Sequence, residues 1–274
     1  MASPALADRD KVVVRATASR KGRHISVTPG TTATTHLSYG RIRLDRETPS
    51  VTFAAGGDEV GLICLSGEAT VTLGPNKYPM GRFDALYVPR DSTIGVETKG
   101  EVDIAEIRAP VDGHYPTQHV RYAEVKANPG LSFRAGGPAS SRTLNILLGK
   151  NIEAGRIVAG VTWSDPGHWT SWPPHEHAAL LEEMYVFFDM PAPSFAIQMV
   201  YTDPNAPERV EVVHDGDAVI MPVGFHPMVS IPGYPVSFIW IMAAKRERED
   251  RLFGVVNVQP GFDQAPSGLE AGRK

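Results

Sequence analysis

The stretch from residue 172 to residue 188 reads WPPHEHAALLEEMYVFF. It places two histidines two residues apart, just ahead of a run rich in β-forming residues. Residues i and i+2 of an extended chain point to the same side, so His175 and His177 can present both imidazoles to one point. Glu183, at the head of the following strand, can add a carboxylate oxygen.

A third histidine stands at the end of a later expected strand. Residues 216–226 read GDAVIMPVGFH, and His226 follows the apolar strand and its proline. Three imidazoles and one carboxylate form a mixed nitrogen and oxygen site, which suits zinc, manganese, iron or nickel. The sequence therefore predicts one divalent metal ion held by His175, His177, Glu183 and His226.

Composition excludes several classes of protein. The chain has 274 residues and a formal net charge of −4 with charges of both signs throughout, so no nucleic-acid-binding face is expected. No apolar run approaches the roughly 18 residues of a spanning helix, and the charged N-terminus does not look like a signal peptide. The one cysteine, Cys64, cannot form an internal disulfide, which favours a reducing cytoplasm.

The 26 glycines and 23 prolines punctuate short runs of Val, Ile, Phe and Tyr, a pattern typical of an all-β fold. Both halves contain an apolar strand that ends in proline, at Pro89 and at Pro222. Four residues past these prolines stand Thr93 and His226, so only the second half should hold metal. We expect two tandem barrels, organised as a flexible arm (1–20), a metal-free barrel (21–110), a connector (111–150), a metal-binding barrel (151–260) and a disordered tail (261–274). The connector either wraps the other half or carries a strand at Leu144–Leu148.

These segments resemble the two signature motifs of the cupin superfamily, H-x-H followed by E and P-x-G followed by H, with spacers one residue longer and one residue shorter than usual. A closer resemblance covers most of the chain. Residues 169–177, 198–202 and 222–227 resemble the inositol-catabolic 5-deoxy-glucuronate isomerases, whereas 183–190 and 238–242 look like the related 5-keto-4-deoxyuronate isomerases. Both are families of bicupins, which implies two double-stranded β-helix (jelly-roll) barrels.

The resemblance implies that the four residues above bind the metal. Glu182 and Glu183 would face opposite sides of a strand, and Glu183 is favoured because it runs directly into Met-Tyr-Val-Phe-Phe, as the family's ligand does. The implied reaction is an aldose–ketose interconversion that turns 5-deoxy-glucuronate into 2-deoxy-5-keto-gluconate.

Residues outside the metal-binding set are candidates for catalysis and for substrate binding. Tyr201 is a candidate for the catalytic base, Gln198 and Tyr185 are candidates for substrate contacts, and Arg142 and Lys150 are candidate cations for an anionic substrate. The partner is a small anionic sugar, with neither nucleic acid nor a membrane, and a homo-oligomer stays open. Three further functions also stay open: a 5-keto-4-deoxyuronate isomerase, a cupin dioxygenase and a non-catalytic sugar-acid-binding protein.

Overall fold

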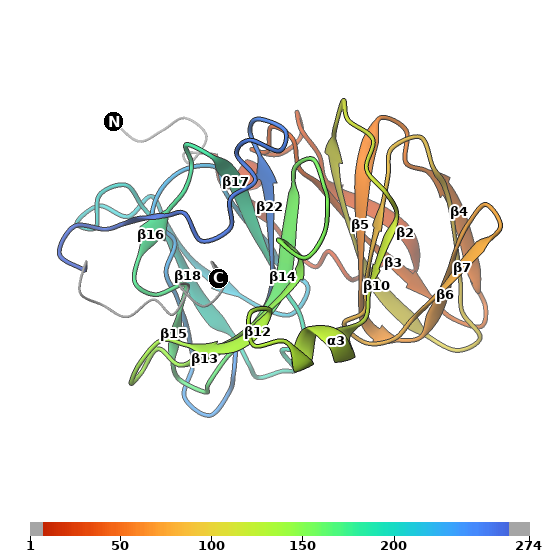
Figure 1. Cartoon of the computed structure of the whole chain (residues 1–274). Helices are drawn as coiled ribbons and strands as arrows, with labels where there is room; N and C mark the ends of the chain where they lie inside the picture. The colour runs from red at the N-terminus through yellow and green to blue at the C-terminus, as the bar shows by residue number, and fades with distance from the viewer. Residues whose placement is uncertain (1–7, 263–274) are drawn as a thin grey trace.

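The computed structural model describes residues 8–262, and its regular secondary structure is almost entirely β (Figure 1). The described helices are the short α2 (Arg9–Val12) and α3 (Tyr122–Ala127). The strands form two units, each built from a larger and a smaller antiparallel sheet. The predicted all-β class is confirmed. None of the helices in residues 8–262 is long and apolar enough to cross a membrane.

The first unit pairs a six-stranded sheet with a four-stranded sheet. The larger has the order β11-β8-β5-β10-β3-β2 and the smaller has the order β4-β9-β6-β7. Their bounds are β2 (Gly22–Val27), β3 (Ser38–Leu44), β4 (Ser50–Ala54), β5 (Asp58–Gly67), β6 (Ala69–Leu73), β7 (Asn76–Met80), β8 (Ala85–Val88), β9 (Thr93–Glu97), β10 (Val102–Pro110) and β11 (Gln118–Val120).

The second unit repeats this plan around the histidine motif. A seven-stranded sheet (β1-β20-β17-β22-β14-β13-β12) faces a four-stranded sheet (β15-β21-β18-β19), and β16 pairs with β23. The bounds are β1 (Val13–Val14), β12 (Ser132–Ala135), β13 (Arg142–Leu148), β14 (Ile157–Ser164), β15 (Trp169–Thr170), β16 (His175–Glu176), β17 (Leu181–Phe187), β18 (Ala196–Val200), β19 (Arg209–Val213), β20 (Ala218–Met221), β21 (Met228–Ser230), β22 (Ser237–Ala244) and β23 (Asn257–Val258).

The two larger sheets pack against each other at the centre of the molecule (Figure 1). The sequence of strand β5 is a continuous apolar run with no alternation of apolar and polar residues, because both faces of the strand are buried. Leu62 and Cys64 point into the core of the first unit, whereas Ile63 points into the core that the two units share. A strand covered on both faces reads as a continuous hydrophobic run.

The boundaries of the units differ from the predicted ones. Residues 12–14, placed in a flexible arm, are anchored to the second unit, because Val13 pairs with Val219 and Val12 is 1% exposed. The second unit also begins earlier than residue 151, since β12 and β13 already belong to its sheet. The strand expected at Leu144–Leu148 exists and extends back to Arg142. Residues 1–7 and 263–274, including nearly all of the predicted tail, lie outside the described residues.

Two buried glutamates tie the units together in a reciprocal way. Glu59 of β5 accepts hydrogen bonds from the backbone N–H groups of residues 155–157 in the second unit, at 2.6–2.7 Å. Glu182 of β17 accepts three from residues 35–37 in the first unit, at 2.5–2.8 Å. Each carboxylate satisfies donors just before a strand of the opposite unit, which fixes how the two units meet.

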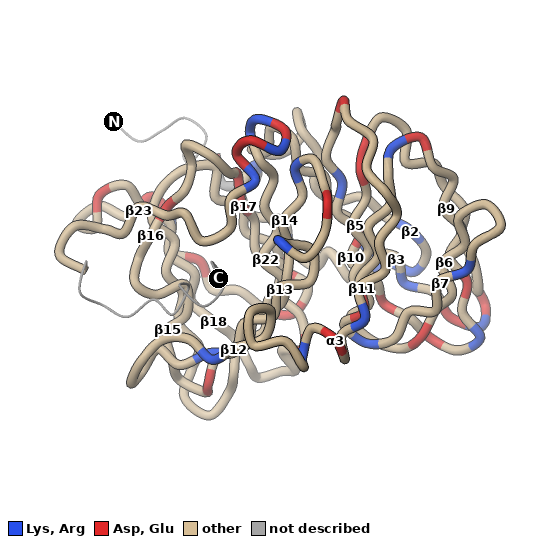
Figure 2. The backbone as a smooth tube through the Cα atoms, viewed as in Figure 1, with Lys and Arg blue, Asp and Glu red and all other residues tan. Residues whose placement is uncertain are grey.

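In Figure 2 the tube is blue at Lys and Arg and red at Asp and Glu, and segments of both colours occur in the first unit and in the second. Neither colour forms a long uninterrupted block along the described part of the tube, in keeping with the mixed charges of the sequence.

Candidate metal centre and cavity

The four predicted metal ligands come together inside the second unit. His175 lies on β16, His177 follows that strand, and Glu183 lies on β17. Pairing of Glu183 with Met221 on β20 brings in the turn that carries His226. That turn needs glycine at position 224, where φ is +96° and a Cβ would lie 2.8 Å from the Tyr201 carbonyl oxygen.

The cluster is tight and almost fully buried. Ligand atoms of the three histidines all lie within 4.8 Å of one another. Oε2 of Glu183 lies 2.9 Å from Nε2 of His177 and 3.0 Å from Nε2 of His226. The exposed fraction of each of the four residues is 8% or less. Sequence positions spread over about fifty residues therefore converge on one point.

Backbone carbonyls orient all three imidazoles. Nδ1 of His175 lies 2.8 Å from the Pro173 oxygen, Nδ1 of His226 lies 3.0 Å from the Gly224 oxygen, and Nδ1 of His177 lies 3.3 Å from the Leu181 oxygen. A carbonyl on Nδ1 favours the tautomer that carries its proton there, which leaves Nε2 as a ligand atom. In each ring Nε2 is thus the atom suited to face a shared ion.

The electrostatics of the cluster keep the carboxylate ionised. Burial alone would raise the pKa of Glu183, but the nearby imidazoles of His177 and His226 lower it to about 2. Burial, followed by the nearby His226, lowers the pKa of His175 to about 3. Burial alone would lower the pKa of His177, but the Glu183 carboxylate raises the pKa of His177 above its ordinary value. At neutral pH the cluster therefore offers an anionic oxygen and a neutral His175.

The environment of Nε2 of His226 indicates that a cation fits between the side chains of the cluster. Nε2 of His226 is buried and makes no hydrogen bond of acceptable geometry among the described residues, although Glu183 lies 3.0 Å away. When the His226 proton is on Nδ1, the lone pair of Nε2 faces a carboxylate oxygen of Glu183. A cation between these two atoms would remove the repulsion between them. A set of three nitrogens and one oxygen suits a divalent transition metal.

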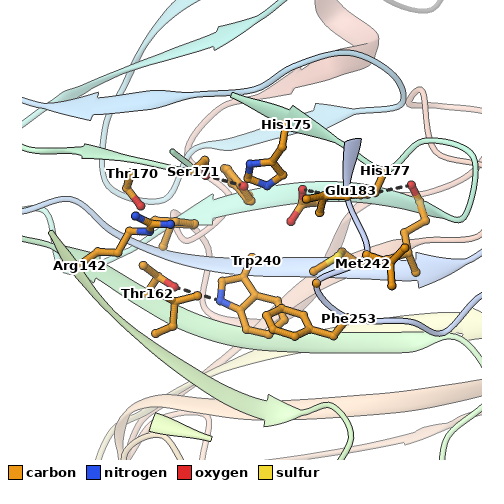
Figure 3. A pocket seen from close by; sticks show the side chains of 17 residues that line it. Arg142, Thr162, Thr170, Ser171, His175, His177, Glu183, Trp240, Met242 and Phe253 are labelled. Atoms are coloured by element: carbon orange, nitrogen blue, oxygen red, sulfur yellow. Dashed lines mark hydrogen bonds and ion pairs between the residues drawn. The ribbon is translucent and has the colours of Figure 1, made fainter. Parts of the chain in front are cut away.

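A cavity opens beside the cluster and is small, with a volume of about 50 Å³. Figure 3 shows Glu183 and His177 at one end, Arg142 and Thr170 at the other, and Trp240 with Phe253 along one side. The segment 253–256 also lines it, ahead of β23, which pairs with the histidine-bearing β16.

Two of the candidate substrate residues lie on the cavity wall. Arg142 is 2% exposed and donates from its guanidinium to the carbonyl oxygens of Ser140 and Trp172. The hydroxyl groups of Tyr185 and Ser171 lie 2.7 Å apart. Burial raises the pKa of Tyr185 well above its usual range, so its phenol stays protonated.

The other three candidates are not among the residues that line the cavity. The side-chain amide of Gln198 donates to the carbonyl oxygens of His226 and Pro227. Tyr201 turns away and donates its hydroxyl to Gln259 at 2.7 Å. Lys150 is exposed and borders a separate hollow with Arg251 and Leu252. Gln198 and Tyr201 thus hold neighbouring backbone and side chains, and Lys150 has no contact with this cavity.

Thr170 and segment 253–256 are cavity residues that the sequence did not reveal. Thr170 lies in a two-residue strand with no motif around it, and the segment follows a charge run that reads as a solvated turn. The pairing of β23 with β16 joins residues more than eighty positions apart, and no local pattern encodes it.

A family model described as the KduI/IolB family matches residues 12–255. The chain belongs to this family. The match spans both units, and it confirms the resemblance seen in the motifs.

Curated relatives of this chain are isomerases. The 5-deoxy-glucuronate isomerase of Geobacillus kaustophilus is 30% identical over 202 residues, which cover 68% of this chain and 71% of the relative. That of Geobacillus thermodenitrificans is 31% identical over 202 residues, covering 68% and 72%. The prediction that this chain is an isomerase is confirmed at the level of the family.

Solved structures confirm the cupin fold. An IolB-like protein from Salmonella typhimurium LT2 has a TM-score of 0.79 and 21% identity, covering 90% of this chain and 96% of the other. A Bacillus subtilis oxalate decarboxylase, described as having Mn(II) centres, has a TM-score of 0.61 and 13% identity, covering 85% and 77%. At these identities the likeness concerns the fold alone.

Proposed function

We propose that this chain is a metal-dependent aldose–ketose isomerase that converts 5-deoxy-glucuronate to 2-deoxy-5-keto-gluconate in inositol catabolism. The observation that carries the proposal is the buried cluster of three histidines and Glu183 at one end of a cavity that has Arg142 at the other. A metal-assisted reaction on an acidic sugar needs a metal-binding cluster for the carbonyl end and a cation for the carboxylate end. The named activity of the curated relatives supports the choice of substrate.

His175, His177, Glu183 and His226 would hold one divalent ion through Nε2 atoms and a carboxylate oxygen. When bound, such an ion would act as a Lewis acid that polarises the substrate carbonyl and stabilises negative charge on the substrate oxygens, an effect worth several kcal/mol in the transition state. Gln198 fixes the backbone that carries His226 and thereby positions this ligand.

The chain's own groups handle the substrate. Tyr185, protonated and oriented by Ser171, can donate a hydrogen bond to a substrate oxygen. The buried wall excludes water from the reacting carbons, which strengthens each of these interactions. Tyr201 supports the site indirectly, by tying the strand β18 region to Gln259 of the C-terminal segment. A single buried thiol, Cys64, is in keeping with a cytoplasmic location.

Residues 183–190 and 238–242 resemble 5-keto-4-deoxyuronate isomerases, so 5-keto-4-deoxyuronate is the second candidate substrate. Turnover separates an isomerase from a dioxygenase and from a non-catalytic binding protein. A dioxygenase would consume oxygen with bound iron, and a binding protein would hold the sugar acid unchanged.

The test is to load the purified protein with Zn, Mn, Fe or Ni and to follow 5-deoxy-glucuronate by NMR. We expect conversion to the ketose, with loss of both metal and turnover in His226→Ala. The exposed His114 provides the control, since His114→Ala should keep full activity. No conversion of 5-deoxy-glucuronate with any of these metals would overturn the proposal.

A further inference from the structure

The cavity has two ends of opposite chemistry. The cluster end offers lone pairs and a carboxylate, whereas the end shown with Arg142 and Thr170 offers hydrogen-bond donors and a positive charge (Figure 3). A substrate that binds in one orientation must therefore carry unlike groups at its two ends.

Thr170 is the unusual member of the donor end. It is 0% exposed, it lies on the cavity wall, and its Oγ1 has no hydrogen-bond partner among residues 8–262. Its backbone is fixed by the pairing of Thr170 with Met228 between β15 and β21. Buried hydroxyl groups almost always find a partner, so an unpartnered one on a cavity wall indicates a ligand atom.

Arg142 provides the charge beside it. The guanidinium is held by Nη1 on the Ser140 oxygen at 3.0 Å and by Nη2 on the Trp172 oxygen at 2.9 Å. These carbonyl contacts orient the guanidinium, and its planar fork of N–H donors matches the geometry of a carboxylate in the cavity.

An apolar wall connects the two ends. Trp240 stacks on Phe253, with ring centroids 5.0 Å apart and an interplanar angle of 27°. Its indole nitrogen donates to Thr162, which leaves only ring carbon for the ligand. Leu144 and Met242 are further apolar residues that line the cavity. Such a wall accepts a CH₂ group more readily than a hydroxyl group.

From these observations we propose that Arg142 and Thr170 form the subsite for the substrate's carboxylate, with the Thr170 hydroxyl as a donor to it. The inference rests on the proposed function and adds the orientation of the substrate. The deoxygenated carbon, which neighbours the carboxylate in 5-deoxy-glucuronate, then lies against Trp240 and Phe253, and the carbonyl end reaches the histidine cluster.

The decisive probe is the alcohol obtained by reducing the aldehyde of 5-deoxy-glucuronate, because it keeps the carboxylate and cannot react. Its affinity and that of its carboxamide are measured by calorimetry on metal-loaded wild type, Thr170→Val and Thr170→Ser. We expect Thr170→Val to weaken binding of the acid roughly 10- to 100-fold, the size of a hydrogen bond to a charged group, and to change binding of the amide much less. Thr170→Ser should retain the wild-type preference for the acid.

Stability distinguishes this role from a structural one. Because the hydroxyl has no partner among the described residues, Thr170→Val should unfold at the same temperature as wild type or higher, with unchanged metal content. Equal loss of acid and amide binding, or no loss of either, would overturn the subsite.

Turnover separates the two proposals. If the protein converts 5-deoxy-glucuronate, Thr170→Val should raise KM with little effect on kcat, and Arg142→Lys should reduce the preference for acid over amide. If the protein converts no sugar acid, but Thr170→Val loses the preference of wild type for binding the acid over its carboxamide, the subsite is supported and the proposed reaction is wrong. Conversion with an unchanged KM in Thr170→Val would refute the subsite alone.

Discussion

Glu182 and Glu183 are neighbours in β17 whose carboxylates lie on opposite faces of the sheet. Glu183 lies 2.9 Å from His177 in the cluster, whereas Glu182 accepts backbone hydrogen bonds from residues 35–37 of the other unit. Strand alternation alone separates their roles. One glutamate belongs to the site and the other to the junction of the two units.

Substitutions of the two residues should therefore affect different properties of the protein. Glu183→Gln is expected to abolish metal retention while leaving the fold intact, because it removes the anionic ligand. Glu182→Gln is expected to cost about 2–3 kcal/mol of unfolding free energy, since it places an amide N–H group among three buried donors. Elemental analysis and denaturant unfolding of both proteins check this. Loss of metal in Glu182→Gln with normal stability would reverse the assignment.

Removal of the metal should lower both activity and thermal stability. An ion that binds only the folded chain adds stability by mass action, so a chelator is expected to lower the Tm. Adding back one divalent ion per chain should restore it in wild type but not in His226→Ala. A Tm of wild type that does not respond to chelator or metal would show that the cluster holds no ion.

Gly160 provides the space in which Trp240 lies. A Cβ at this position would come within 2.1 Å of the Asn145 carbonyl oxygen and 2.3 Å of Cζ2 of Trp240. Gly160→Ala should thus destabilise the protein by about 1–3 kcal/mol and weaken substrate binding by displacing the indole. Gly100, which has open space around it, is the matched control, and Gly100→Ala should be close to neutral in denaturant unfolding.

The segment 253–256 should move when substrate enters. The volume of about 50 Å³ is well below the roughly 300 Å³ at the low end of ligand pockets, and this segment forms part of the wall. Hydrogen exchange of residues 252–258 is expected to be faster without ligand and slower with the reduced substrate analogue. Exchange that is equally slow in both states would mean that the substrate enters elsewhere.

Glu247 should make stability depend on pH. It accepts hydrogen bonds from the backbone of Asp112 and Gly113 and from the Tyr115 hydroxyl. Burial alone would raise its pKa, but these bonds, led by that of Tyr115, lower it below the ordinary value.

The pKa of Glu247 is lower in the folded state than in the unfolded state. Its stabilisation of the fold is therefore complete at pH values above the unfolded-state pKa of about 4.3, and it is lost as the pH falls through the folded-state pKa. The stability difference between wild type and Glu247→Gln should accordingly shrink below about pH 4. The exposed Glu249 provides a control, because Glu249→Gln should change little at any pH. A difference that widens in acid would contradict this account.

The sequence determined the β-class, the repeated plan and the four cluster residues, because each depends on local pattern. Alternation places His175 and His177 on one side and turns Glu182 away from Glu183, and Gly224 permits the turn before His226. Alternation also limited Gln198 and Tyr201 to one cavity residue at most, and neither lies on the wall.

Only the tertiary structure decided which other side chains share the cavity with the cluster. Arg142 and Lys150 are equally plausible cations at the two ends of the β13 region, yet one is buried at the cavity and the other is exposed to solvent. Thr170 and segment 253–256 reach the site through pairings of β15 with β21 and of β16 with β23. Such pairings join distant parts of the chain through backbone hydrogen bonds, which carry no side-chain signature, so the sequence alone could not specify them.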